Sequence, residues 1–119
     1  VSIKEIILIN ICVFISTFIK LLIKRKRPYK KYKYIYNLSG SKHKNKTALY
    51  SFPSGHTVTA TIFILIMVHR HGYKFLYIVP FLVAFSRIYL GVHYISDVTF
   101  GLIFSIIFFI IIKKNKLLI

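Results

Sequence analysis

The sequence predicts an all-α fold, an integral membrane bundle of about four transmembrane helices in a single domain over 1–119. The chain has 119 residues, of which 56% are hydrophobic, and its mean hydropathy is +0.67. Soluble domains of this size are less apolar, and so short a chain could not surround several apolar helices with polar structure. We therefore favour a membrane bundle over the buried core of a soluble protein.

Four apolar blocks carry this prediction, over 6–23, 57–68, 75–92 and 98–112. A membrane-spanning helix needs about 20 residues. The second and fourth blocks reach that length with flanking aromatic residues, which sit well at a membrane interface. Blocks two to four are apolar on all sides, which is typical of helices buried in lipid. Because successive helices alternate in direction, we expect the polar ends of the four blocks to share one membrane face.

Between the first two blocks, the segment 24–52 carries ten Lys or Arg residues and is predicted to be a basic, solvated loop. The whole chain has 18 basic residues against two acids and a net charge of +16. Such a charge attracts anions such as lipid headgroups, phosphorylated substrates and nucleic acid. The loop lacks a nucleic-acid recognition module, so we expect no nucleic acid partner. The single cysteine, Cys12, excludes an intrachain disulfide.

Polar residues that a membrane helix normally avoids gather near the block ends. Lys20 lies about one turn inside the end of the first block, and Arg27 follows shortly after it. Ser54 is placed to cap the helix of the second block, and Gly55 allows a ligand to approach the backbone closely. Free N–H groups at such a helix start bind phosphate-like anions. His56, in the first turn, adds a group that exchanges a proton near neutral pH.

Arg87, His93 and Asp97 form the remaining cluster around the third and fourth blocks. On a helix, His93 and Asp97 would be four residues apart and share a face. A carboxylate beside an imidazole fixes its tautomer and raises its basicity, which leaves the other ring nitrogen free to attack. Taken alone, each cluster could be a simple cap or an interfacial side chain. Together they are the equipment for phosphoryl transfer, with cations to hold the phosphate and two histidines for attack and protonation.

These positions resemble the three-part signature of the type 2 phosphatidic acid phosphatase superfamily. That superfamily includes lipid phosphate phosphatases, polyprenyl diphosphatases and vanadium haloperoxidases, the last being larger soluble proteins. All eleven fixed positions are present in order, as Lys20-x6-Arg27-Pro28, Pro53-Ser54-Gly55-His56 and Ser86-Arg87-x5-His93-x3-Asp97.

The resemblance implies a membrane phosphatase that hydrolyses a lipid phosphate or diphosphate through a phosphohistidine. It implies that His93 is the nucleophile, that Asp97 orients it, and that His56 is the general acid. The implied phosphate-binding residues are Lys20, Arg27, Ser54, Gly55 and Arg87. Basic side chains replace a metal in this family, so neither a metal nor another cofactor is expected.

Membrane members of that family usually have six helices, and the first signature lies at the end of the third. This chain matches the family from that third helix onward, so we expect it to be either a fragment or a reduced member. Two other functions stay open: a lipid phosphotransferase with the same site, and a non-catalytic basic protein that binds anionic lipid. The positive-inside rule places the basic loop in the cytoplasm, whereas the resemblance implies a non-cytoplasmic active face, which we favour. The sequence leaves the oligomeric state open.

Overall fold

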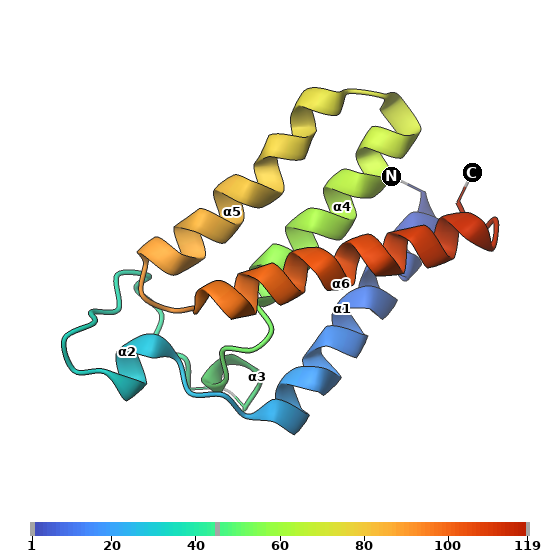
Figure 1. The fold of residues 1–119 in the computed structure, drawn as a ribbon. Coiled ribbons are helices and arrows are strands. Elements are labelled where there is room, and N and C mark those ends of the chain that lie inside the picture. The colour runs from blue at the N-terminus through green and yellow to red at the C-terminus, as the bar shows by residue number, and fades with distance from the viewer. Residues whose placement is uncertain (1, 45, 119) are drawn as a thin grey trace.

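The computed structural model describes residues 2–44 and 46–118. Four helices, α1 (Ile3–Ile23), α4 (Gly55–His71), α5 (Ile78–Tyr89) and α6 (Ile95–Lys114), pack into one bundle. The short helices α2 (Pro28–Lys31) and α3 (Lys46–Leu49) lie between α1 and α4, and the 3₁₀ helix η1 (Lys74–Tyr77) leads into α5. Figure 1 shows α2 and α3 at one end of the bundle and both chain termini at the other.

The expectation of an all-helical fold is confirmed, because each apolar block forms a helix and the described residues contain no named strand. Of the described helices, α1 and α6 are long and apolar enough to cross a membrane by length and composition, which weakly suggests membrane association. Helix α4 has 17 residues and α5 has 12, so both are shorter than these two.

The end of the third block differs from its predicted position at residue 92. Helix α5 ends at Tyr89, and Gly91 then turns the chain with a φ of 78°. A side chain at Gly91 would also collide with the carbonyl oxygen of Tyr36. The turn therefore requires glycine for two reasons, the positive φ and the lack of space for a Cβ. His93 therefore lies in the turn before α6. The prediction that His93 and Asp97 share one helical face is wrong, since only Asp97 is helical.

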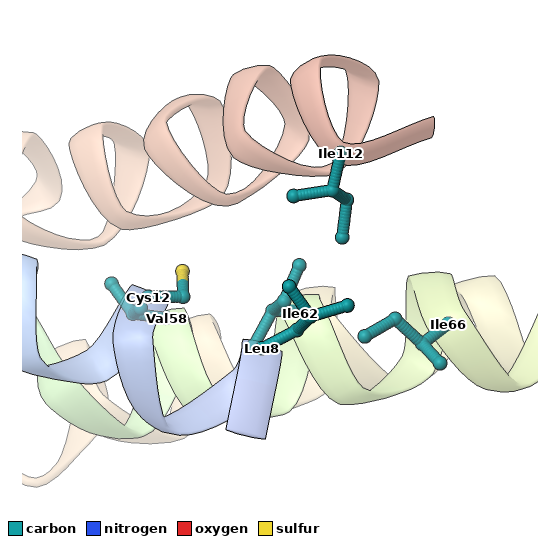
Figure 2. Packing of buried hydrophobic residues seen from close by; sticks show 6 residues of the cluster. All are labelled: Leu8, Cys12, Val58, Ile62, Ile66 and Ile112. Atoms are coloured by element: carbon teal, nitrogen blue, oxygen red, sulfur yellow. The ribbon is translucent and has the colours of Figure 1, made fainter. Parts of the chain in front are cut away.

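Helix α4 is the centre of the bundle and packs against α1, α5 and α6. Figure 2 shows the buried apolar cluster that holds α1, α4 and α6 together, formed by Leu8, Cys12, Val58, Ile62, Ile66 and Ile112. Helix α5 contributes no residue to this described cluster, and its buried residues are the small or compact Pro80 and Ala84. The buried apolar cluster therefore lies on the side of α4 that faces α1 and α6.

Ser54 caps α4 as predicted, because its Oγ accepts hydrogen bonds from the backbone N of Thr57 at 3.3 Å and from Thr57 Oγ1 at 2.9 Å. The backbone N of Ser54 also donates to the carbonyl oxygen of Asp97 at 3.2 Å, which ties the start of α4 to α6. Opposite this cap, Gly101 allows a close approach, since a Cβ there would lie 3.3 Å from Thr57 side-chain atoms. The two helix starts that carry the predicted site residues are thus joined directly.

At the opposite end of the bundle, the only acid in α1 pairs with α4. Glu5 caps the backbone N of Ser2 at 2.9 Å and forms a short ion pair with Arg70. Glu5 is buried, so Arg70 neutralises a charge that would otherwise be costly to hold out of water. The pair anchors α1 to α4 far from the site.

The Gly101 contact predicts a specific loss of stability. Gly101→Val should force α6 away from Thr57, because a branched side chain overfills the space, and such overpacking typically costs about 1–3 kcal/mol. Thermal unfolding in detergent should show a clearly lower Tm for Gly101→Val. Ile107→Val, at an exposed position of α6, should change the Tm little, and equal effects of the two variants would contradict the close packing described here.

Candidate active site

The connecting segment 24–52 is more ordered than a solvated loop. Its two ends run side by side, with a backbone bridge between Lys26 and Tyr50 and a 2.8 Å hydrogen bond from the N of Ser51 to the carbonyl oxygen of Arg25. Arg27, His43 and Ser51 are buried within it. The prediction that this segment is basic holds, but part of it packs onto the end of the bundle and builds the site.

A cavity of about 970 Å³ opens at this end of the bundle. Its walls come from α1, α4, α5, the connecting segment and the turn before α6. Six of the eight predicted site residues line it, namely Lys20, Arg27, Gly55, His56, Arg87 and His93. The structure thus brings together residues that lie as far apart in the sequence as Lys20 and His93.

The two ring nitrogens of His93 have different partners. Nδ1 lies 2.9 Å from the carbonyl oxygen of Ser51. A carbonyl oxygen only accepts, so this contact assigns the proton to Nδ1 and the lone pair to Nε2. Nε2 lies 3.2 Å from the Nη1 of Arg27, whose N–H donates to it. The lone pair of Nε2 therefore faces the cationic part of the cavity, where it accepts this hydrogen bond.

His93 is buried, and its charge state follows from that position. Burial lowers the pKa of His93, and the positive charges of Arg27 and Lys20 lower it further, whereas Asp97 raises it. The net shift is downward from the ordinary value, so the ring is neutral at pH 7. A neutral imidazole with its proton on Nδ1 is the form that attacks through Nε2.

Asp97 lies behind His93, and its carboxylate interacts with several partners. Its Oδ2 accepts a 2.8 Å hydrogen bond from the backbone N of Tyr94 and lies 3.5 Å from His93 Nδ1. Its Oδ1 pairs with Arg25 Nη1 at 2.9 Å. The carbonyl oxygen of Ser51 is thus nearer to Nδ1 than the carboxylate is, and the carboxylate is shared between His93, Tyr94 and Arg25.

Arg27 joins three parts of the site. Its Nε donates to the carbonyl oxygen of Ala48 at 2.7 Å, and its Nη1 donates to the carbonyl oxygen of Val92 at 3.1 Å as well as to His93. The guanidinium is almost fully buried, and burial lowers the pKa of Arg27 from its usual value. A buried cation of this kind has a strong electrostatic attraction for an anion in the cavity.

The opposite wall carries the second predicted histidine. Nη1 of Arg87, from α5, lies 3.5 Å from Nδ1 of His56, at the start of α4. His56 is exposed toward the cavity side, unlike His93. Gly55 sits beside Lys20, whose Nζ would lie 3.7 Å from a Cβ at the glycine. Any larger side chain at Gly55 would thus occupy space next to the ammonium group.

Two predicted residues do not reach the cavity wall. Ser54 is fully buried, and its hydroxyl is used to cap α4. Asp97 is fully buried behind His93. Both support cavity residues from behind.

Three residues near the site were not predicted from the sequence. Arg25 stands in a run of basic residues in the sequence, and in the structure it pairs with Asp97 and lies 4.2 Å from the centroid of the Tyr94 ring. Ser51 acts through its backbone carbonyl, which no side-chain pattern reveals. His43 lines the cavity with the two predicted histidines, and its residue type was the one available signal. Among the described residues, no group of three or more His, Cys, Asp or Glu side chains could hold a metal ion.

Comparison with known proteins places the chain in a family. The family model of the PAP2 superfamily matches residues 5–116. No curated protein and no solved structure matches the chain. The match runs through every segment that lines the cavity. The chain belongs to the PAP2 superfamily, and this membership indicates phosphatase activity on phosphate esters.

Proposed function

We propose that the chain is a membrane phosphatase that hydrolyses a lipid phosphate or diphosphate through a phosphohistidine on His93. The arrangement of His93 carries this proposal: Nδ1 is held by the Ser51 carbonyl, and Nε2 faces Arg27 in a cavity rich in cations. The proposal covers the lipid nature of the substrate as well as the phosphohistidine mechanism.

The roles of the other residues follow from their places around the cavity. Lys20, Arg27 and Arg87 bind the phosphate oxygens and neutralise the charge that develops on them, with the amide of Gly55 and its Ser54-capped helix start beside them. Nε2 of His93 attacks phosphorus, and His56 gives a proton to the departing oxygen. His56 then accepts a proton from a water molecule whose oxygen attacks phosphorus, so that an O–P bond forms, the bond from phosphorus to Nε2 breaks, and inorganic phosphate leaves His93. Three cationic side chains fill the place of a metal ion in this scheme.

The apolar walls of the same cavity favour a lipid substrate. Ile9 and Val13 of α1, Ala60 and Phe63 of α4, and Val83 of α5 continue the cavity away from the cations. An acyl or isoprenyl chain would bury its surface along these side chains at roughly 25 cal/mol per Å². A small water-soluble phosphate ester would leave this part of the cavity unused.

The outer surface of the bundle supports placement of its four helices, α1, α4, α5 and α6, in the membrane. Phe14 of α1 and Phe81 and Phe85 of α5 are exposed at 72%, 64% and 68%. Such aromatic surface is unfavourable in water and suits contact with lipid chains. In this proposal residues 1–119 form one membrane domain and the segment 24–52 lies at the interface. The non-cytoplasmic side of the active face is proposed from the family resemblance alone.

Release of phosphate from phosphatidic acid, lysophosphatidic acid and polyprenyl diphosphate tests the proposed function. The wild-type chain in mixed micelles should release phosphate from at least one of them, with or without EDTA. His93→Ala should abolish release. His56→Ala should slow lipid phosphate cleavage more than p-nitrophenyl phosphate cleavage, because a leaving group of low pKa needs less protonation.

His71→Ala is the matched control, since His71 lies at the far end of α4 and is exposed; it should behave as wild type. The same assay with an added lipid alcohol distinguishes transfer from hydrolysis. Full activity in His93→Ala, loss of activity in EDTA that Mg²⁺ restores, or equal losses on both substrates in His56→Ala would contradict the mechanism.

The Arg25–Asp97 ion pair predicts an effect on the pH profile. Arg25→Gln removes the cation next to Asp97, so the carboxylate acts more strongly on His93 and raises its pKa. The charges that face His93 are otherwise those of Arg27 and Lys20, which remain. Because His93 must be neutral to attack, the acidic limb of kcat/KM should move to higher pH, measured on whichever lipid phosphate the wild type hydrolyses.

Arg25→Lys keeps a positive charge and should shift the limb less. Lys24→Gln removes the neighbouring exposed charge and controls for the general effect of charge. An equal shift in Lys24→Gln and Arg25→Gln would show that the ion pair does not act on His93.

A further inference from the structure

His43 is a buried residue in a part of the connecting segment whose other residues are exposed. It is only 9% exposed, whereas Ser41, Lys42 and Lys44 around it are exposed. Its backbone takes a left-handed conformation with a φ of 49°, which is uncommon for a residue with a side chain. The segment therefore turns inward at this one residue.

Three interactions hold His43 in that position. The Tyr29 hydroxyl lies 2.8 Å from Nδ1 of the ring. The Nζ of Lys30 donates to the carbonyl oxygen of His43 at 3.1 Å, and the backbone N of His43 donates to Ser41 Oγ at 3.2 Å. Both the ring and the backbone are thus fixed, which is the requirement for a preorganised binding group.

The held ring faces the proposed phosphate site. His43 lines the same cavity as Arg27, Arg87 and His93. Since Nδ1 is bonded to Tyr29, the ring nitrogen left for the cavity is Nε2. Burial lowers the pKa of His43 to about 4, with the nearby charges of Arg27 and Lys30 contributing, so the ring is neutral at pH 7.

We propose that His43 is a further phosphate-binding residue, in which Nε2–H donates a hydrogen bond to a phosphate oxygen while the Tyr29 hydroxyl donates to Nδ1. This inference rests on the proposed function, because it places the substrate phosphate in the cavity. A neutral donor suits a wall where Lys20, Arg27 and Arg87 already repel one another, since it adds a hydrogen bond without a fourth charge. The connecting segment would thereby contact the ligand through His43 as well as through Arg27.

Binding of inorganic phosphate to the detergent-solubilised full chain tests this role without turnover. His43→Ala should weaken binding about tenfold, the range for loss of one hydrogen bond to a charged group. His43→Gln, whose amide can place a neutral donor near the position of Nε2, should recover most of the affinity. Tyr29→Phe removes the same internal hydrogen bond but keeps the imidazole, so it should weaken binding less than His43→Ala. His71→Ala should bind as wild type.

A second measurement uses the unaltered protein. In ¹⁵N-histidine spectra, the ring signals of His43, identified by their loss in His43→Gln, should shift on saturation with phosphate. Absence of that shift overturns the proposal. The proposal is also overturned if His43→Ala loses no more phosphate affinity than Tyr29→Phe does, or if His43→Gln fails to recover affinity. Either result would show that His43 has a purely structural role.

The two proposals fail separately. Phosphate binding that depends on His43 in a chain with no lipid phosphate hydrolysis supports the phosphate contact and contradicts the proposed function. If the chain hydrolyses a lipid phosphate but its phosphate affinity does not depend on His43, the proposed function is supported and the phosphate contact by His43 is contradicted.

Discussion

The hydrogen bond from Nδ1 of His93 to the carbonyl oxygen of Ser51 connects the two halves of the candidate site. Ser51 belongs to the strand-like end of the connecting segment just before α4, and His93 belongs to the turn just before α6. The same Ser51 is bonded through its N to Arg25, at the start of the connecting segment after α1. One backbone position thus fixes the tautomer of the proposed nucleophile and the relative placement of three helices.

The charges of the site are arranged around that bond. Asp97 is the one acid in the site, and Arg25 pairs with it from behind His93. In front, Lys20, Arg27 and Arg87 line the cavity with no described carboxylate among the lining residues. An anion bound there would balance charges that the protein itself leaves uncompensated. This asymmetry is the basis for proposing that a phosphate group binds on the cavity side of His93.

The helices could be predicted from the sequence because an apolar block is a local signal. Most of the cavity residues could be predicted because they belong to the signature shared with the family. The four apolar blocks became helices, and Lys20, Arg27, Gly55, His56, Arg87 and His93 line one cavity as the motif implied. The end of α5 was misplaced by three residues, because the apolar run continues past the turn at Gly91. Burial of hydrophobic residues alone does not mark where a helix stops.

The residues that were missed act through tertiary contacts that no local pattern encodes. Arg25 was hidden among the lysines next to it, and Ser51 contributes a backbone oxygen. One signal was available in the basic residues: the chain holds 18 Lys and Arg residues, and its few arginines each make a specific polar contact. Guanidinium groups form directional, paired hydrogen bonds that ammonium groups do not reproduce. In a lysine-rich chain, the arginines are therefore better candidates than the lysines for residues that make specific contacts.

The position of the phosphoryl group on His93 tests the central claim most directly. The chain is mixed with labelled lipid phosphate, quenched rapidly in base to preserve phosphohistidine, and digested, and the modified residue and its isomer are then identified by mass spectrometry and NMR. The bond between Nδ1 and Ser51 predicts a phosphoryl group on Nε2 of His93. A phosphoryl group on Nδ1, or on any other residue, would contradict the account.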